Sequence, residues 1–184
     1  MPSNNAVVVL VNFHLEASAI KKVSEIYGNL WVMIPFVRTV ATMVAVKKLL
    51  EEEGLKQSDS FKLWMMAEVP SNAILLEKFV KEAGIDGISI GSNDLTQLLL
   101  GADRDNPKLA QFDERDDAVM WSLERLVTQA KKGGITASIC GQAPSDYPEM
   151  TTKLVKWGIT SVSINPDVIE KTREIVARAE GIIK

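Results

Sequence analysis

Two stretches decide the fold: residues 89–97 (SIGSNDLTQ) and residues 138–148 (SICGQAPSDYP). In each stretch, a short apolar run stops abruptly at glycine and at polar side chains. A buried strand that carries reactive groups to its carboxyl end is typical of α/β enzymes. Cys140, the only cysteine of the chain, stands at the end of the second apolar run. We therefore expect a functional site at the carboxyl ends of parallel strands.

Outward from these stretches, short apolar runs alternate with amphipathic segments. The runs predict strands at 31–36, 63–68, 87–91, 136–140 and 161–164. The segments between them predict helices at 40–53, 71–83, 116–132, 148–156 and 166–180. This alternation indicates an α/β fold with a parallel sheet and about five β/α units, either doubly wound or a (β/α)₈ barrel. Before these units, the β-branched run 6–11 predicts a strand and the periodicity of 13–27 predicts a helix.

The composition is that of an ordinary globular domain. The 184 residues are 46% hydrophobic and 24% charged, with a formal net charge of −3. No basic stripe is present to neutralise nucleic-acid phosphates. No apolar run approaches the roughly 20 residues of a membrane span, and the N-terminus lacks the basic region of a signal peptide. We expect a cytoplasmic protein that binds neither nucleic acid nor membrane.

Glu68 and Asp94 are the sharpest candidate pair, because each follows the end of a predicted strand. Two strand-end carboxylates, with water completing the shell, are a normal arrangement for Mg²⁺. Ordinary structural roles stay open for both side chains. Asp94 would serve as a helix N-cap, and Glu68 would serve as a salt-bridge partner at the rim of the sheet.

Cys140 and Arg104 also have two interpretations each. A lone cysteine in an apolar strand is often a small buried hydrophobic side chain. The position of Cys140 directly before Gly141 and Gln142 favours a reactive thiol at the strand end. Arg104 lies in the charged run 103–106 (DRDN), which is either a solvated loop or a contact for phosphate or carboxylate.

Six motifs in this order carry a resemblance to a known family: residues 32–39, 66–72, 89–97, 101–106, 140–148 and 163–167. Together they resemble the C-terminal PEP/pyruvate-binding domain of phosphoenolpyruvate synthase, within the PEP-utilising enzyme family. Pyruvate phosphate dikinase and enzyme I of the sugar phosphotransferase system are more distant relatives. The resemblance covers residues 13–180.

The resemblance implies a TIM-type barrel that interconverts pyruvate and phosphoenolpyruvate, a transferase (kinase) reaction of gluconeogenesis. It implies that Glu68 and Asp94 hold Mg²⁺, for which Mn²⁺ would substitute, and that the metal stabilises charge on the enolate. It gives Cys140 the role of acid and base at the methyl carbon of pyruvate. The residues that it places at the substrate are Gly91, Ser92, Asn93, Arg104 and Gln142.

The chain also departs from the family. Nothing in it matches the ATP-grasp domain or the swivelling domain with its phosphohistidine, and the five β/α units correspond to the last five of eight. We expect a partial barrel over residues 13–184, preceded by a lead of residues 1–12 outside the family. Open sheet edges are seldom left bare, so a homo-oligomer is expected.

Three functions remain open at this point. The first is the PEP/pyruvate domain of an ATP, pyruvate, water dikinase, inactive alone in the overall reaction and dependent on the missing domains as partners. The second is a stand-alone binding or assembly module that keeps the magnesium and substrate site without turnover. The third is a Mg²⁺-dependent lyase acting on a pyruvate enolate, which the motif from Cys140 to Gln142 disfavours.

Overall fold

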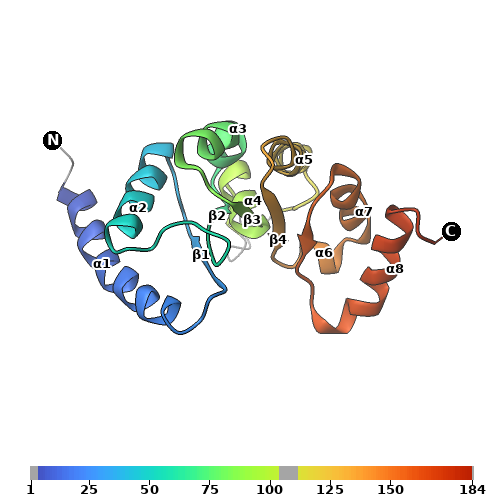
Figure 1. Cartoon of the computed structure of the whole chain (residues 1–184). Helices are drawn as coiled ribbons and strands as arrows, with labels where there is room; N and C mark the ends of the chain where they lie inside the picture. The colour runs from blue at the N-terminus through green and yellow to red at the C-terminus, as the bar shows by residue number, and fades with distance from the viewer. Residues whose placement is uncertain (1–3, 104–111, 184) are drawn as a thin grey trace.

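A computed structural model describes residues 4–103 and 112–183 of the chain, and Figure 1 shows its fold as an arc of β/α units. One parallel sheet has the strand order β1-β2-β3-β4-β5. The strands are β1 (Leu30–Ile34), β2 (Phe61–Ala67), β3 (Gly87–Gly91), β4 (Thr136–Cys140) and β5 (Ser161–Val162). Within the described ranges, β1 and β5 each pair on one side only, so the sheet is not closed. The expected α/β fold, a partial barrel of about five β/α units, is confirmed.

Helices α2, α3, α5 and α7 lie along the outside of the arc, with α1 at one end and α8 at the other (Figure 1). The helix bounds are α1 (Asn4–Ser24), α2 (Val40–Glu52), α3 (Pro70–Lys78), α4 (Ser92–Leu100), α5 (Asp117–Lys132), α6 (Ala143–Asp146), α7 (Pro148–Trp157) and α8 (Ile169–Ala179). A π-helical turn, η1 (Phe79–Ala83), continues α3, and a 3₁₀ turn, η3 (Pro166–Val168), precedes α8.

The expected strand at 6–11 is wrong, because these residues belong to helix α1. The strand preference of valine is weak and depends on context, and here residues 6–11 are part of a continuous helix of 21 residues. Helix α1 also runs without a break across the predicted boundary between residues 12 and 13. The division into a lead and a barrel domain stays a prediction.

Two helices have no counterpart in the sequence prediction. Helix α4 occupies most of the polar stretch 89–97, and the short helix α6 follows directly after Gln142. Both begin among Ser, Asn, Asp, Gln and Pro, which are as common in turns as in first helical turns. Strand β5 is also shorter than predicted, ending at Val162.

Side chains at alternate strand positions bury the sheet against the helices. Met65, Ile88 and Ile139 are fully buried on this outer face. The opposite side is called the inner face here, and it carries Trp64 and the exposed Trp31, whose rings stack with centroids 5.2 Å apart. The inner face is therefore partly apolar and open to solvent over the part of the chain that the structure describes.

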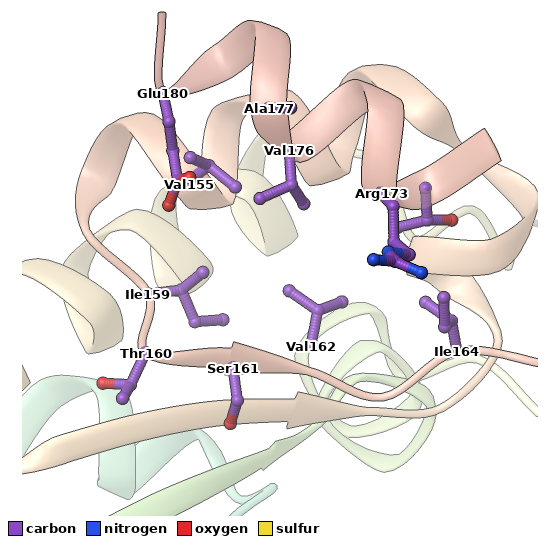
Figure 2. Close-up of a pocket in the computed structure, with 11 residues that line it drawn as sticks. Val155, Ile159, Thr160, Ser161, Val162, Ile164, Arg173, Val176, Ala177 and Glu180 are labelled. Atoms are coloured by element: carbon purple, nitrogen blue, oxygen red, sulfur yellow. The ribbon is translucent and has the colours of Figure 1, made fainter. Parts of the chain in front are cut away.

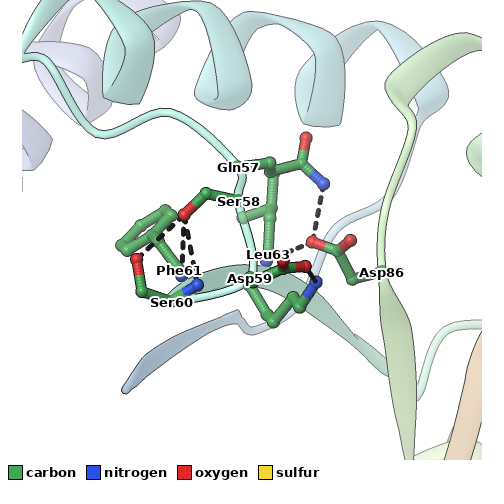
Figure 3. Close-up of polar contacts among 8 residues, drawn as sticks. Gln57, Ser58, Asp59, Ser60, Phe61, Leu63 and Asp86 are labelled. Atoms are coloured by element: carbon green, nitrogen blue, oxygen red, sulfur yellow. Dashed lines mark hydrogen bonds and ion pairs between the residues drawn. The ribbon is translucent and has the colours of Figure 1, made fainter. Parts of the chain in front are cut away.

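A polar network fixes the amino ends of β2 and β3 (Figure 3). Asp86 Oδ2 accepts hydrogen bonds from Leu63 N (2.8 Å) and Gln57 Nε2 (2.7 Å). Gln57 Nε2 also donates to Gly84 O at 2.7 Å, and Asp86 N donates to Leu63 O at 2.8 Å. These contacts lie at the end of the sheet opposite the expected site, where side chains usually serve stability.

Replacement of Asp86 by alanine is expected to lower the free energy of unfolding by about 1–3 kcal/mol. The Leu63 N–H and the Gln57 amide would lose their shared acceptor. Denaturant titration measures the change. Asp59→Ala is the control, because Asp59 is exposed and, among the described residues, makes one long ion pair with Lys62 (3.9 Å), worth about 0–1 kcal/mol. Equal stability of the two variants would contradict the prediction.

Candidate functional site

Three consecutive strands bring their carboxyl ends together at one edge of the inner face. Gly91 at the end of β3 is in register with Cys140 at the end of β4. On the other side of β3, Ala67 is in register with Ile90, so Glu68 is the next residue to come level with Gly91. Glu68, Gly91 and Cys140 thus form one row, as expected from their positions at strand ends.

Glu68 is a buried carboxylate with one engaged oxygen. Its side chain is 4% exposed, and its Oε1 accepts a hydrogen bond from Phe36 N at 2.7 Å. Its Oε2 lies against Gly91, where an added Cβ would come within 2.8 Å of it. Any side chain at position 91 would therefore displace the carboxylate.

The surroundings of Glu68 favour its neutral form. Burial raises the pKa of the carboxyl above its ordinary value of 4.5, the Phe36 N–H lowers it in part, and the charge of Asp94 raises it further. Among the described residues, no ion pair involves Glu68 or Asp94. The structure therefore gives no support to the salt-bridge role for Glu68, and it leaves two mutually repelling carboxylates that a cation would relieve.

Asp94 lies half-buried in the first turn of α4. The N-cap position of this helix is Gly91, and no side chain caps it. Asp94 is therefore not the N-cap of α4, which was one of its two expected roles. Together with Glu68 it offers two carboxylates, a set that Mg²⁺ completes with water. No group of three or more His, Cys, Asp and Glu side chains in the described ranges is arranged so that it could hold a metal ion.

Cys140 stands half-buried beside the residues that follow β3. Its Sγ donates to Ile90 O at 3.5 Å, and its backbone O accepts from Ser92 Oγ at 3.3 Å. Gly141 has φ 108°, and a Cβ on it would lie 2.5 Å from Ser92 Oγ and 3.5 Å from Asn93 Oδ1. The end of β4 and the start of α4 are packed so closely that position 141 requires glycine.

The remaining predicted substrate residues fall into two groups. Gln142 is exposed next to Cys140, and its backbone O accepts hydrogen bonds from Ser145 N and Asp146 N. Asn93 is half-buried beside Gly141. Arg104 lies outside the described residues. The structure thus brings together every described residue of the predicted site, in the segments 91–94 and 140–142 and at Glu68.

Two residues at this site have no role in the sequence prediction. Phe36 contributes its backbone N–H to Glu68, and Asn72 binds the backbone at both Glu68 and Val37. Both lie in motifs of the resemblance, at 32–39 and 66–72. That is the only signal in the sequence that marks them, because a backbone contact depends on conformation rather than on side-chain type.

A separate hollow of about 370 Å³ lies between β5 and helices α7 and α8 (Figure 2). Val155, Ile159, Val162 and Val176 give it apolar walls, with Arg173 at its rim. Its lining includes none of the predicted site residues. The hollow shows that α8 covers the last strand only loosely.

None of the helices in the described ranges combines the length and the apolar character that crossing a bilayer requires.

Comparison with known proteins identifies the family. A family model described as PEP-utilising enzyme, PEP-binding domain, matches residues 11–181. The chain is 54% identical over 173 residues to a probable phosphoenolpyruvate synthase of Staphylothermus marinus, covering 91% of this chain and 20% of that protein. It is 52% identical over 173 residues to phosphoenolpyruvate synthase of Aeropyrum pernix (91% of this chain, 21% of that protein) and 47% identical over 164 residues to that of Escherichia coli (87% and 20%).

The chain spans about a fifth of the length of these relatives. The matched range runs from within α1 to just beyond α8, so it includes the whole sheet and every described site residue. The resemblance drawn from the six motifs is confirmed. The chain belongs to the PEP-utilising enzyme family as its PEP-binding domain, and it is homologous to part of phosphoenolpyruvate synthase.

Proposed function

We propose that the chain carries the half-site in which pyruvate and phosphoenolpyruvate interconvert. The observation that supports this most directly is the row of Glu68, Gly91 and Cys140 at the ends of β2, β3 and β4, with Asp94 beside it. It joins a carboxylate pair suited to a divalent cation with a thiol at the same edge of the sheet. The relatives named phosphoenolpyruvate synthase support the same assignment on independent grounds.

In this proposal Glu68 and Asp94 hold Mg²⁺, or Mn²⁺ in its place. When bound, the metal supplies positive charge next to the oxygens of pyruvate, where negative charge develops as a proton leaves. Two features of the chain position Glu68 for this role. The Phe36 N–H donates a hydrogen bond to Glu68 Oε1, and Gly91, which has no side chain, leaves room for Glu68 Oε2. The ionised form of Glu68, which burial disfavours, becomes the stable one once a cation is present.

Cys140 moves the proton. In the direction of phosphoenolpyruvate, its thiolate takes a proton from the methyl carbon of pyruvate, and the electron pair of the broken C–H bond passes into the enolate. In the reverse direction, the thiol returns the proton to carbon. Asn93 and Arg104 would contact the phosphoryl group, and Gly91, Ser92 and Gln142 would bind the rest of the substrate.

The phosphoryl transfer itself needs a partner. The enolate oxygen would form its bond to phosphorus as the bond between phosphorus and a histidine nitrogen breaks on another domain. ATP bound to an ATP-grasp domain would again phosphorylate that histidine, which lies on the swivelling domain. We therefore expect the chain alone to be inactive in the overall reaction, although it would catalyse proton exchange, and we place it in the cytoplasm, in gluconeogenesis.

A second function is favoured by one observation, the open sheet. Trp31 and Met33 expose 57% and 42% of their surface on the inner face, where a complete barrel would enclose them. A site built on an open sheet would bind a metal and substrate without the enclosure that turnover needs. The chain would then be a binding or assembly module derived from the enzyme domain.

Titration with oxalate, which mimics the enolate of pyruvate, tests the half-site. We expect calorimetry to detect one oxalate per chain in the presence of Mg²⁺, because the carboxyl groups of Glu68 and Asp94 offer the oxalate anion no positive charge until a cation lies between them. Without a divalent cation, and in Asp94→Asn with it, binding should fall by at least about tenfold. Oxalate binding of the same strength with and without Mg²⁺ would refute the proposed site.

Self-association is the expected consequence of the open edges. Strands β1 and β5 leave backbone groups unpaired within the described ranges, and parallel sheets seldom leave such edges bare. Sedimentation velocity at micromolar concentration should show a dimer or a larger species. A monomer at all concentrations up to the millimolar range would show that the edges are covered in another way.

A further inference from the structure

We propose that Asn72 is a positioning residue for Glu68. It ties the first turn of α3 to the segment after β1, and this tie holds the Phe36 N–H against the Glu68 carboxylate. The inference rests on the proposed function in taking Glu68 as a cation ligand. It goes beyond that function by identifying what keeps this ligand in place.

Asn72 is fully buried at the start of α3, directly behind Glu68. Its side-chain Oδ1 accepts hydrogen bonds from two consecutive backbone N–H groups, Glu68 N at 3.2 Å and Val69 N at 2.9 Å. The amide oxygen thereby satisfies donors that precede a helix whose N-cap, Val69, has no side-chain acceptor. The backbone of Glu68 is fixed by this contact.

The nitrogen of the same amide reaches a different part of the chain. Asn72 Nδ2 donates to Val37 O at 2.8 Å, and its neighbour Ser71 donates from Oγ to Arg38 O at 2.7 Å. Val37 directly follows Phe36, the residue whose N–H meets Glu68 Oε1. One side chain therefore binds the backbone of Glu68 directly and the backbone of Val37, the residue that follows Phe36.

The segment needs such a hold because Phe36 has φ 49°. The left-handed region is uncommon for a bulky residue and persists only where the surroundings impose it. The Phe36 side chain is half exposed and adds little packing of its own. The hydrogen bond from Asn72 to Val37 O, the residue next to Phe36, is therefore the contact best placed to keep the Phe36 N–H directed at Glu68.

Only an amide satisfies both sides of this position. Aspartate keeps the acceptor for Glu68 N and Val69 N, but it has no donor for Val37 O and sets a negative oxygen against it. Alanine removes both contacts. The polar atoms of Asn72 are engaged by the backbone, so its effect on a bound cation passes through Glu68. Loss of a hydrogen-bonding partner behind a metal ligand typically weakens metal binding about 10–100-fold.

The test compares Asn72→Ala and Asn72→Asp with Ser71→Ala, which removes the parallel bridge to Arg38 O and leaves the contact with Glu68 intact. Mn²⁺ affinity is measured from the electron paramagnetic resonance signal of free Mn²⁺. Hydrogen exchange of the Phe36 amide is measured by NMR without metal, with the Leu63 amide at the far end of the sheet as the internal reference. We expect both Asn72 variants to bind Mn²⁺ at least about tenfold more weakly and to exchange the Phe36 amide faster relative to Leu63. Ser71→Ala should stay within about twofold of wild type.

Unchanged Mn²⁺ affinity and Phe36 exchange in the Asn72 variants would overturn the inference. So would an equal loss in Ser71→Ala, since a general tie between the two turns would then explain the effect. If only the alanine variant fails to fold, the aspartate variant, which keeps the cap, decides. Failure of both to fold would overturn the positioning role in favour of a structural one. If wild type binds no Mn²⁺, the proposed cation site fails, and the exchange of the Phe36 amide alone decides the role of Asn72.

Discussion

Replacement of Cys140 by alanine is expected to reduce the exchange of pyruvate methyl protons in deuterated water to the uncatalysed rate. The thiol lies in the row with Glu68 and Gly91, at the edge where a cation held by the carboxylates would stabilise the enolate. Without the thiol, the only ionisable group left in that row is Glu68, which the proposed function assigns to the cation, and general acid–base catalysis is worth about 10²–10⁴-fold. Proton NMR of pyruvate with Mg²⁺ follows the reaction without ATP or further domains.

The control for this experiment is Asp86→Ala, which alters the opposite end of the sheet and should keep the wild-type exchange rate at a temperature where it is folded. Exchange that persists in Cys140→Ala would remove the cysteine from the mechanism. Absence of exchange in wild type, together with demonstrated binding of Mg²⁺ and oxalate, would instead support the binding or assembly module.

Loss of divalent cation binding is expected in Glu68→Gln and, by a different route, in Gly91→Ala. The first variant removes a ligand charge. The second places a Cβ 2.8 Å from Glu68 Oε2, so the carboxylate has to move away from its position in the row. Titration calorimetry with Mn²⁺ should show an affinity at least about a hundredfold lower in Glu68→Gln, the upper end of what partners behind a ligand contribute. In Gly91→Ala the loss should be about tenfold or more.

Gly28→Ala is the matched control for the glycine variant, because nothing lies within 4 Å of its added Cβ. It should bind Mn²⁺ as wild type does. Wild-type affinity in both Glu68→Gln and Gly91→Ala would locate the cation elsewhere, and no Mn²⁺ binding by wild type would remove the proposed cation site.

The same site sets a pH dependence. Because the pKa of Glu68 in the folded chain is raised above 4.5, the folded state holds more proton at this carboxyl than the unfolded state does at pH values between 4.5 and the folded pKa. The metal-free protein therefore loses this contribution to stability as the pH rises from 4.5 through the folded pKa. Mn²⁺ binds the ionised form, so its stabilisation should grow over the same window. Thermal unfolding with and without Mn²⁺ at pH 5 and pH 7 measures both effects.

The alternation of strands and helices could be predicted from the sequence because each strand buries apolar side chains against the helices, as Met65, Ile88 and Ile139 do. Each strand therefore appears in the sequence as a short apolar run. The grouping of Glu68, Asp94 and Cys140 could be predicted as well, since parallel strands present their carboxyl ends at one edge. The detailed geometry of the row of Glu68, Gly91 and Cys140 could not be predicted. The close approach of Gly91 to Glu68 depends on the register of β2 with β3, which no single residue encodes.

Other features escaped prediction for different physical reasons. The valines of 6–11 favour a strand locally, yet they lie within helix α1. Helix α4 begins at Ser92 with residue types that are also common in loops, because their side chains can form hydrogen bonds with the nearby backbone. The contribution of Phe36 is a backbone N–H in a left-handed conformation, and its aromatic side chain gives no indication of that role.

The strand order has a consequence for how the molecule comes apart. Each strand pairs only with its neighbours in the chain, so the five units form a short linear array in which every unit depends on the adjacent ones. In such an array an end unit can unfold locally by losing its single interface with the next unit. The interior units have two interfaces each, so they unfold only when the whole domain unfolds. Glu68, Asp94 and Cys140 belong to β2, β3 and β4 and their extensions, which are the interior units. Fraying of α1 with β1, or of β5 with α8, would leave these three residues on paired strands, although the loss of β1 would also release the Phe36 N–H from Glu68.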